Sequence, residues 1–211
     1  MRSLLVTAVI ALPASASAEM VRLDVSAFSK DLGGEFQLTI VTGDPGIAGA
    51  FSDLSPTTFQ SFCMESGEGF SPGSIYSFVM NSTTVPGVSG PADPLDARTA
   101  YLYTKFRNGT LAALGYDYSA AGRQASAGLL QQAIWFIEEE SLGMSNAFVE
   151  SANAAVAPGG EWHGVGIGDV RILNLFGSDG SNMQDQLTLI PAPGGLGILG
   201  LSGCIIGRRR R

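Results

Sequence analysis

The chain has 211 residues, of which 45% are hydrophobic and only 15% are charged. Its 19 acidic residues outnumber its 12 basic residues, and the formal net charge is −7. Because such a surface repels nucleic acid and anionic membranes, we exclude a function in nucleic-acid binding.

The N-terminus has the features of a secretory signal peptide. Arg2 precedes an apolar run from Leu4 to Leu12, and residues 16–18 (Ala-Ser-Ala) form a small-residue cleavage pattern. The run is too short to span a bilayer as a stable helix. We therefore expect residues 1–18 to be removed, so that the mature chain begins at Glu19.

Four strands are predicted in the first part of the mature chain. Apolar residues alternate over residues 21–25 and again over residues 36–40, on either side of a Gly33-Gly34 turn. Residues 57–63 are rich in β-branched and aromatic side chains and predict a third strand, and residues 75–80 predict a fourth.

The hydrophobic period changes to that of a helix at Asp96. Asp96 is suited to cap a helix that runs through Phe106 and ends at Asn108-Gly109. A second helix is predicted from Gly122 or Arg123 to Glu140. Its buried face follows from the spacing of four apolar residues, Leu130, Ala133, Ile134 and Ile137.

Strand patterns return over residues 170–176 and 186–190, after a glycine-rich block at 158–168. Strands, a helical pair and further strands predict an α+β fold, with a β-sandwich-like core and a helical insertion. Residues 19–190 are enough for one domain with a single core.

The C-terminus has three parts in a fixed order. Pro191, Ala192 and Pro193 are followed by the apolar, glycine-rich residues 194–207, which predict a short apolar helix. The last four residues are Arg208, Arg209, Arg210 and Arg211. By the positive-inside rule, such a cluster is expected to anchor this end of the chain on the cytoplasmic side of the membrane.

This order resembles the PEP-CTERM sorting signal of Gram-negative bacteria, although Ala192 replaces the glutamate that names the motif. The resemblance implies that an exosortase-type membrane protease recognises residues 191–211. It also implies transient anchoring in the inner membrane, followed by location at the cell surface or in the extracellular matrix. A permanent tail anchor is the alternative.

Removing both ends sharpens the composition. Without Arg2 and the four terminal arginines, 7 basic residues remain against 19 acidic residues, a net charge of −12. Cys204 lies in the tail, so Cys63 is the one cysteine of the mature chain, and it is either buried and inert or present for its reactivity. Lys30 and Lys105 are the only lysines, so a reactive acyl group would meet few nucleophiles from its own chain.

Two motifs point to the chemistry of that cysteine. Cys63 lies in the sequence Phe62-Cys63-Met64-Glu65, and Gln131 lies in Leu-Gln-Gln-Ala-Ile-Trp at residues 130–135. Together and in this order they resemble the thioester domains of bacterial surface adhesins. In that family, a cysteine after an aromatic residue or leucine is cross-linked to the glutamine of an apolar-Gln-polar-apolar-apolar pattern. The resemblance assigns the cross-link to Cys63 and Gln131, with Gln132 as the polar spacer.

The resemblance implies a covalent adhesin without enzymatic turnover. The Cys63 thiolate would expel ammonia from the Gln131 amide, and Phe62, Trp135 or Phe136 would shield the thioester from water. Amides are poor acylating agents, so the fold must supply proximity, orientation and hydrogen bonds to the oxyanion. An unknown amine-bearing ligand on a surface or matrix would then form a stable amide with Gln131 and release Cys63.

Two alternatives remain at this point. The chain would be a non-reactive structural domain of the extracellular matrix if Cys63 is only a small buried hydrophobe. It would be a cysteine hydrolase if Cys63 acts with His163, the only histidine, and with Asn174. Against the hydrolase, His163 lies in a glycine-rich loop and Cys63 does not open a helix. One histidine and one mature cysteine cannot make a zinc cage, and we expect no metal and no cofactor.

Overall fold

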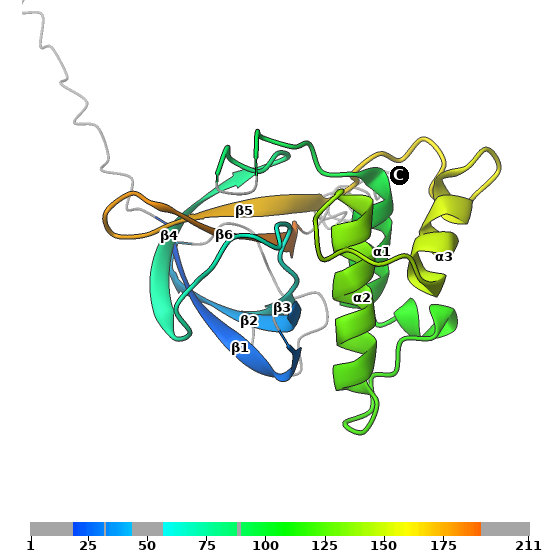
Figure 1. Cartoon of the computed structure of the whole chain (residues 1–211), viewed down its shortest axis with the longest axis horizontal. Helices are drawn as coiled ribbons and strands as arrows, with labels where there is room; N and C mark the ends of the chain where they lie inside the picture. The colour runs from blue at the N-terminus through cyan, green and yellow to red at the C-terminus, as the bar shows by residue number, and fades with distance from the viewer. Residues whose placement is uncertain (1–18, 32, 44–56, 88–89, 191–211) are drawn as a thin grey trace, which may run out of the picture.

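The structure is a computed structural model that describes residues 19–31, 33–43, 57–87 and 90–190. It contains a six-stranded antiparallel sheet and three α-helices, with the helices inserted between the fourth and fifth strands (Figure 1). The strands are β1 (Met20–Lys30), β2 (Gly33–Thr42), β3 (Thr58–Ser61), β4 (Ser74–Asn81), β5 (Val170–Phe176) and β6 (Asn182–Leu189). The helices are α1 (Ala97–Arg107), α2 (Arg123–Ile137) and α3 (Ala147–Val156), and a 3₁₀ turn, η1, spans Leu111–Leu114.

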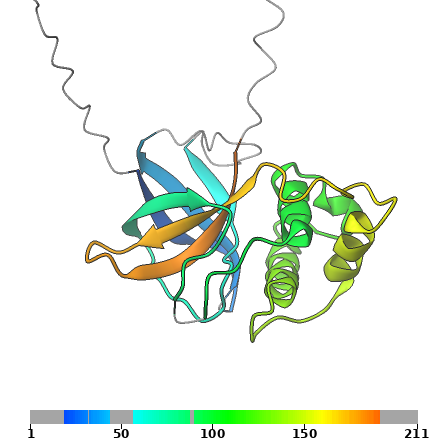
Figure 2. The same ribbon diagram turned by 90° about the horizontal axis from the view of Figure 1, so that it is seen from above.

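The predicted mixture of strands and helices is confirmed, but the strands do not form two packed sheets. They form one sheet in the order β3-β2-β1-β4-β5-β6, which curls until its two edges meet (Figure 2). The residues just after β3 pair with β6: the Leu187 N–H donates to the Phe62 carbonyl at 3.0 Å. Cys63 and Gln186 form a bridge at the same place. The sandwich expectation was therefore wrong, because alternation in sequence identifies a half-buried strand but not its partner sheet.

The helices lie together on one side of the curled sheet (Figures 1 and 2). The predicted start of α1 is confirmed, since the Asp96 carboxylate accepts from the Arg98 N–H at 2.7 Å. α2 ends at Ile137, three residues before the predicted end at Glu140. α3 was not predicted; its clearest signal is Asn146, whose side chain caps the Phe148 N–H at 3.0 Å.

Two hydrophobic clusters hold the fold together. The inner cluster fills the curled sheet, and it contains Cys63 together with Trp135, which reaches into it from α2. The outer cluster lies between the sheet and the helices and includes Phe62 and Met64. Consecutive residues of a strand point to opposite faces, so Phe62, Cys63 and Met64 alternate between the two clusters. Cys63 thus lies where the two edges of the sheet meet, and it shares the inner cluster with Trp135 of α2.

A buried ion pair fastens α2 to the sheet. Glu35 on β2 accepts from Arg123, at the first turn of α2, at 2.6 Å from Nε and 2.8 Å from Nη2. The Tyr116 hydroxyl also donates to Glu35. Both charged side chains are almost fully buried, and in such a setting a charge is tolerated only with its partner in place.

The two ends of the chain are outside this description. Residues 1–18 and 191–211, for which a signal peptide and a sorting segment are predicted, lie outside the described residues. Within the described ranges, no helix is both long and apolar enough to cross a membrane.

Breaking the ion pair should destabilise the whole domain. We expect Arg123→Met to lower the free energy of unfolding by about 3 to 5 kcal/mol, because it leaves the Glu35 carboxylate buried without its partner. Urea unfolding followed by tryptophan fluorescence measures the change. The Glu35→Gln/Arg123→Met double variant should lose less than the sum of the two single variants; strict additivity would show that the pair does not couple β2 to α2.

Candidate functional site

The structure brings Cys63 and Gln131 into direct contact, although 68 positions separate them in the chain. The Cys63 thiol donates to Gln131 Oε1 at 3.4 Å, and the Cys63 backbone N–H donates to the same oxygen at 3.2 Å. In return, Gln131 Nε2 donates to the Cys63 carbonyl at 2.8 Å. The glutamine amide therefore lies alongside the cysteine main chain, with its carbonyl group next to the sulfur.

This contact is enclosed by the fold. Cys63 is 0% exposed and Gln131 is 1% exposed. Gln132, the neighbouring glutamine, is half-buried and lines a pocket. Of the two glutamines, Gln131 is the one whose amide reaches the cysteine.

Gly33 at the start of β2 makes room for the Gln131 side chain. A Cβ atom at position 33 would lie 2.4 Å from Gln131 Cγ and 2.8 Å from the Trp135 ring. Neither distance is possible for a real Cβ atom, so any other residue would push α2 or these side chains away. The sequence marked Gly33 only as part of a turn, because its contact lies about a hundred residues away along the chain.

The three candidate shielding residues have different positions. Trp135 is 5% exposed and packs in the inner cluster with Cys63, and Phe62 is fully buried in the outer cluster. Phe136 is 43% exposed, because it lies on the outer side of α2. The burial of Trp135 beside Cys63 fits a shielding role. Phe62 is buried on the opposite face of the strand from Cys63, and the exposed position of Phe136 does not support the expectation that it excludes water.

The environment of Cys63 keeps its thiol protonated. Burial raises the pKa of the thiol far above its ordinary value, and the nearby Glu140 and Glu65 carboxyl groups add to the increase. The Trp135 indole N–H partly offsets the effect of burial, because it lowers the pKa of the thiol. This N–H has no hydrogen-bond partner of ordinary geometry among the described residues. A sulfur nucleophile at this position must lose its proton within the reaction itself.

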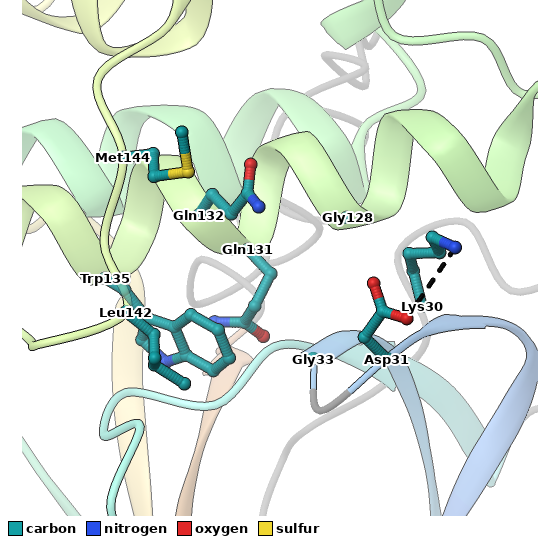
Figure 3. Close-up of a pocket in the computed structure, with 9 residues that line it drawn as sticks. All are labelled: Lys30, Asp31, Gly33, Gly128, Gln131, Gln132, Trp135, Leu142 and Met144. Carbon is teal, nitrogen blue, oxygen red and sulfur yellow. Dashed lines mark ion pairs between the residues drawn. The ribbon is translucent and has the colours of Figure 1, made fainter.

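A pocket leads from the protein surface to Gln131. Its volume is about 270 Å³, and it is formed by the β1–β2 turn, by α2 and by the loop after α2 (Figure 3). Trp135, Leu142 and Met144 line one side, and Lys30 and Asp31 line the other. Gln131 forms part of the pocket lining although it is only 1% exposed, because its amide is turned away from the pocket and toward Cys63.

A cluster of carboxyl groups lies next to Cys63. Glu65 is buried two residues after the cysteine. Its pKa is raised to about 9, mainly by burial and secondly by the neighbouring Glu68. Burial also raises the pKa of Asp185 to about 7, against hydrogen bonds that include one at 2.7 Å from Asn174. Among the described residues, no group of three or more histidine, cysteine or carboxylate side chains has an arrangement suited to a metal ion.

The residues of the hydrolase alternative are occupied elsewhere. His163 Nδ1 lies 3.2 Å from the Val156 carbonyl in an exposed turn. The Asn174 side chain donates to the Thr83 carbonyl and to Asp185. The hydrogen bonds of Cys63 go to Gln131, so the structure does not assemble a triad around the thiol.

No protein-family model matches the chain, and comparison with the curated proteins and with the solved structures found no match either. The chemistry of the site must therefore be inferred from its own residues.

Filling the space at Gly33 should disrupt the contact. We expect Gly33→Ala to lower the free energy of unfolding by about 1 to 3 kcal/mol, because the new methyl group overlaps Gln131 and Trp135. Gly69→Ala is the matched control, since a Cβ atom there meets nothing within 4 Å. Urea unfolding of both variants checks the difference, and equal stabilities would mean that α2 does not pack on Gly33 as described.

The carboxyl cluster should make stability depend on pH. In the unfolded chain both carboxyl groups lose their protons near their ordinary pKa values of about 4. In the folded chain Glu65 keeps its proton up to a pKa of about 9, and Asp185 keeps its proton up to a pKa of about 7. The free energy of unfolding should therefore fall as pH rises from about 5 to 9, by at most about 1.4 kcal/mol per pH unit for each group. Urea unfolding across this range should show a shallower slope for Glu65→Gln, whereas the exposed Glu150→Gln control should keep the slope of the parent chain. A parent slope that rises with pH would contradict the expectation.

Proposed function

We propose that this chain is an exported domain that captures an amine-bearing partner covalently through a thioester between Cys63 and Gln131. The observation that carries the proposal is the 3.4 Å separation between Cys63 Sγ and Gln131 Oε1, with both side chains almost fully buried. A buried thiol beside a glutamine carbonyl has the proximity that this reaction needs.

The first step joins the two side chains. Cys63 Sγ attacks the Gln131 Cδ, the carbon–sulfur bond forms, and the bond from Cδ to Nε2 breaks. The Cys63 N–H, 3.2 Å from Oε1, is placed to stabilise the negative charge that develops on this oxygen. The thiol proton leaves with the nitrogen as ammonia, so the chain becomes lighter by one ammonia.

The second step transfers the acyl group to the partner. A neutral amine entering the pocket attacks the same carbon, forms an amide with it and expels the Cys63 sulfur, which takes up the proton that the amine loses. The pocket supports this step because Gln131 forms part of its lining. Its apolar side, with Trp135 and Leu142, suits the aliphatic stem of a lysine side chain.

The proposal includes the fate of the two ends. Residues 1–18 would direct export, and residues 191–211 would hold the chain in the inner membrane until an exosortase-type protease acts there. The domain of residues 19–190 would then reach the cell surface or the extracellular matrix. A ligand with several accessible amines, on another cell or in the matrix, is the partner that fits this location.

A second candidate function is that of a non-reactive structural domain in the extracellular matrix. The feature that favours it is the burial of the thiol, which raises its pKa and makes Cys63 a poor nucleophile. In that case the hydrogen bonds between Cys63 and Gln131 would only satisfy a buried amide. Since a buried thiol resists alkylation in the folded chain with or without a function, the mass of the chain must decide.

The test is the intact mass of the freshly purified full chain beside four variants from the same host. We expect the parent to be lighter by one ammonia than the mass calculated for its observed termini, and the Cys63→Ala and Gln131→Ala variants to have the full masses calculated in the same way. Gln132→Ala, the matched control, should still lose ammonia, because the sulfur is hydrogen-bonded to the Gln131 amide. Methylamine should add to Gln131 of the fresh parent and leave a Cys63 thiol that alkylates after unfolding.

A parent of full mass, with no methylamine adduct, would reject covalent capture and support the structural domain. His163→Ala, the fourth variant, distinguishes the hydrolase alternative. It should behave as the parent does in every assay, whereas a hydrolase would lose its activity.

A further inference from the structure

One of the two lysines of this chain lies in the pocket that leads to Gln131. Lys30 is at the end of β1 and Asp31 follows it in the β1–β2 turn, and both line the pocket with Gln131 (Figure 3). The sequence led us to expect few nucleophiles from the chain itself near a reactive acyl group. The structure brings one of them to the same cavity.

Two glycines allow the side chains of Lys30 and Gln131 to pack closely at this pocket. Gly128 lies one helical turn before Gln131 on α2, and a Cβ atom there would be 2.9 Å from Lys30 Cγ. Gly33 pairs with Lys30 across the β1–β2 turn, and its own missing Cβ faces Gln131. The Lys30 stem is therefore packed against α2 within about one turn of the reactive glutamine, with no side chain at position 33 or 128 to block it.

The charge of Lys30 is only loosely held. Its Nζ lies 3.7 Å from the Asp31 carboxylate, and the side chains are 50% and 79% exposed. Figure 3 shows the ammonium group turned toward Asp31 and away from the Gln131 amide. An exposed pair of this length restrains a flexible lysine weakly, so a change of rotamer can release it. By contrast, Lys105 Nζ lies 2.8 Å from the Glu161 carboxylate, and Lys105 is not part of the pocket lining.

We propose that Lys30 is an internal acceptor for the Gln131 acyl group, which ties β1 to α2 by an isopeptide bond in competition with the partner. This inference rests on the proposed thioester. The neutral Lys30 amine attacks Gln131 Cδ, the carbon–nitrogen bond forms, and the carbon–sulfur bond breaks. The Cys63 sulfur takes up the proton that the amine loses. No oxidant, reductant or further reactant is needed.

The consequence is a limited time for capture. An amine tethered within the pocket competes at a high effective concentration with any free amine. The ion pair with Asp31 slows the internal reaction, because it draws the Lys30 ammonium group away from the Gln131 amide. A partner that arrives early is captured, whereas a domain that meets no partner closes on itself and becomes inert and more rigid.

The experiment follows the methylamine-reactive fraction of the full chain as it ages at about pH 8.5, because nucleophilic amines react faster in mildly alkaline solution. In the parent this fraction should fall while the mass stays lower than calculated by one ammonia. Hydrolysis is distinct, because it would add one water. Lys30→Arg should still lose ammonia and should keep its methylamine reactivity roughly tenfold longer, because arginine preserves the charge but does not attack. Lys105→Arg should behave as the parent does.

Trypsin mapping after methylamine treatment and unfolding locates the bond. An isopeptide-bonded Lys30 resists cleavage, so residues 23–98 should stay together and be joined to residues 124–171, with an alkylatable Cys63. Asp31→Asn should speed the reaction, and asparagine suits the left-handed backbone at this position, where φ is 54°. Cys63→Ala should abolish the bond.

Two different failures can be told apart. If the aged parent keeps its methylamine reactivity and trypsin cuts after Lys30 in all molecules, the internal acceptor is wrong and the proposed thioester stands. If no chain ever loses ammonia, the thioester itself is wrong and the inference falls with it.

Discussion

The close packing of α2 on the curled sheet is the constraint on which the rest of this structure depends. The Glu35–Arg123 pair ties the first turn of the helix to β2. Because both charges are buried, separating them would leave each without the other in the protein interior. Two turns later, Gly33 lets the Gln131 side chain pass the sheet. Because the ion pair and the close packing at Gly33 fix α2 at two points, the helix cannot slide along the sheet. The Gln131 amide therefore lies against Cys63.

The closure of the sheet supplies the other half of the site. Cys63 lies where the chain leaves β3 and pairs with β6, so its backbone is fixed from both sides. The same backbone provides the donor and the acceptor that orient the Gln131 amide. The cysteine thus contributes its sulfur and also the hydrogen bonds that position its partner, and the site needs few other residues.

The site is asymmetric in its access to solvent. On the sulfur side it is closed by the inner cluster and Trp135, and a carboxyl cluster around Glu65 lies beyond. On the glutamine side it opens into a pocket with one apolar wall and one charged wall. If the proposed thioester forms there, its burial would protect it from water and the pocket beside it would receive the amine. In the proposed mechanism, the position of Lys30 in that pocket would limit the time available for capture.

The sequence by itself determined the local structure: α1 with its Asp96 cap, the positions of most strands and an α+β composition, because these follow from periodicity and capping over a few residues. It also singled out Cys63 and Gln131, through motifs rather than through geometry. Only the tertiary structure decided that the strands form one curled sheet, that Phe136 faces outward and that Gly33 and Lys30 belong to the site. The reason is physical: pairing of sheet edges and packing between distant segments depend on contacts across the fold, which alternation and helical spacing do not encode.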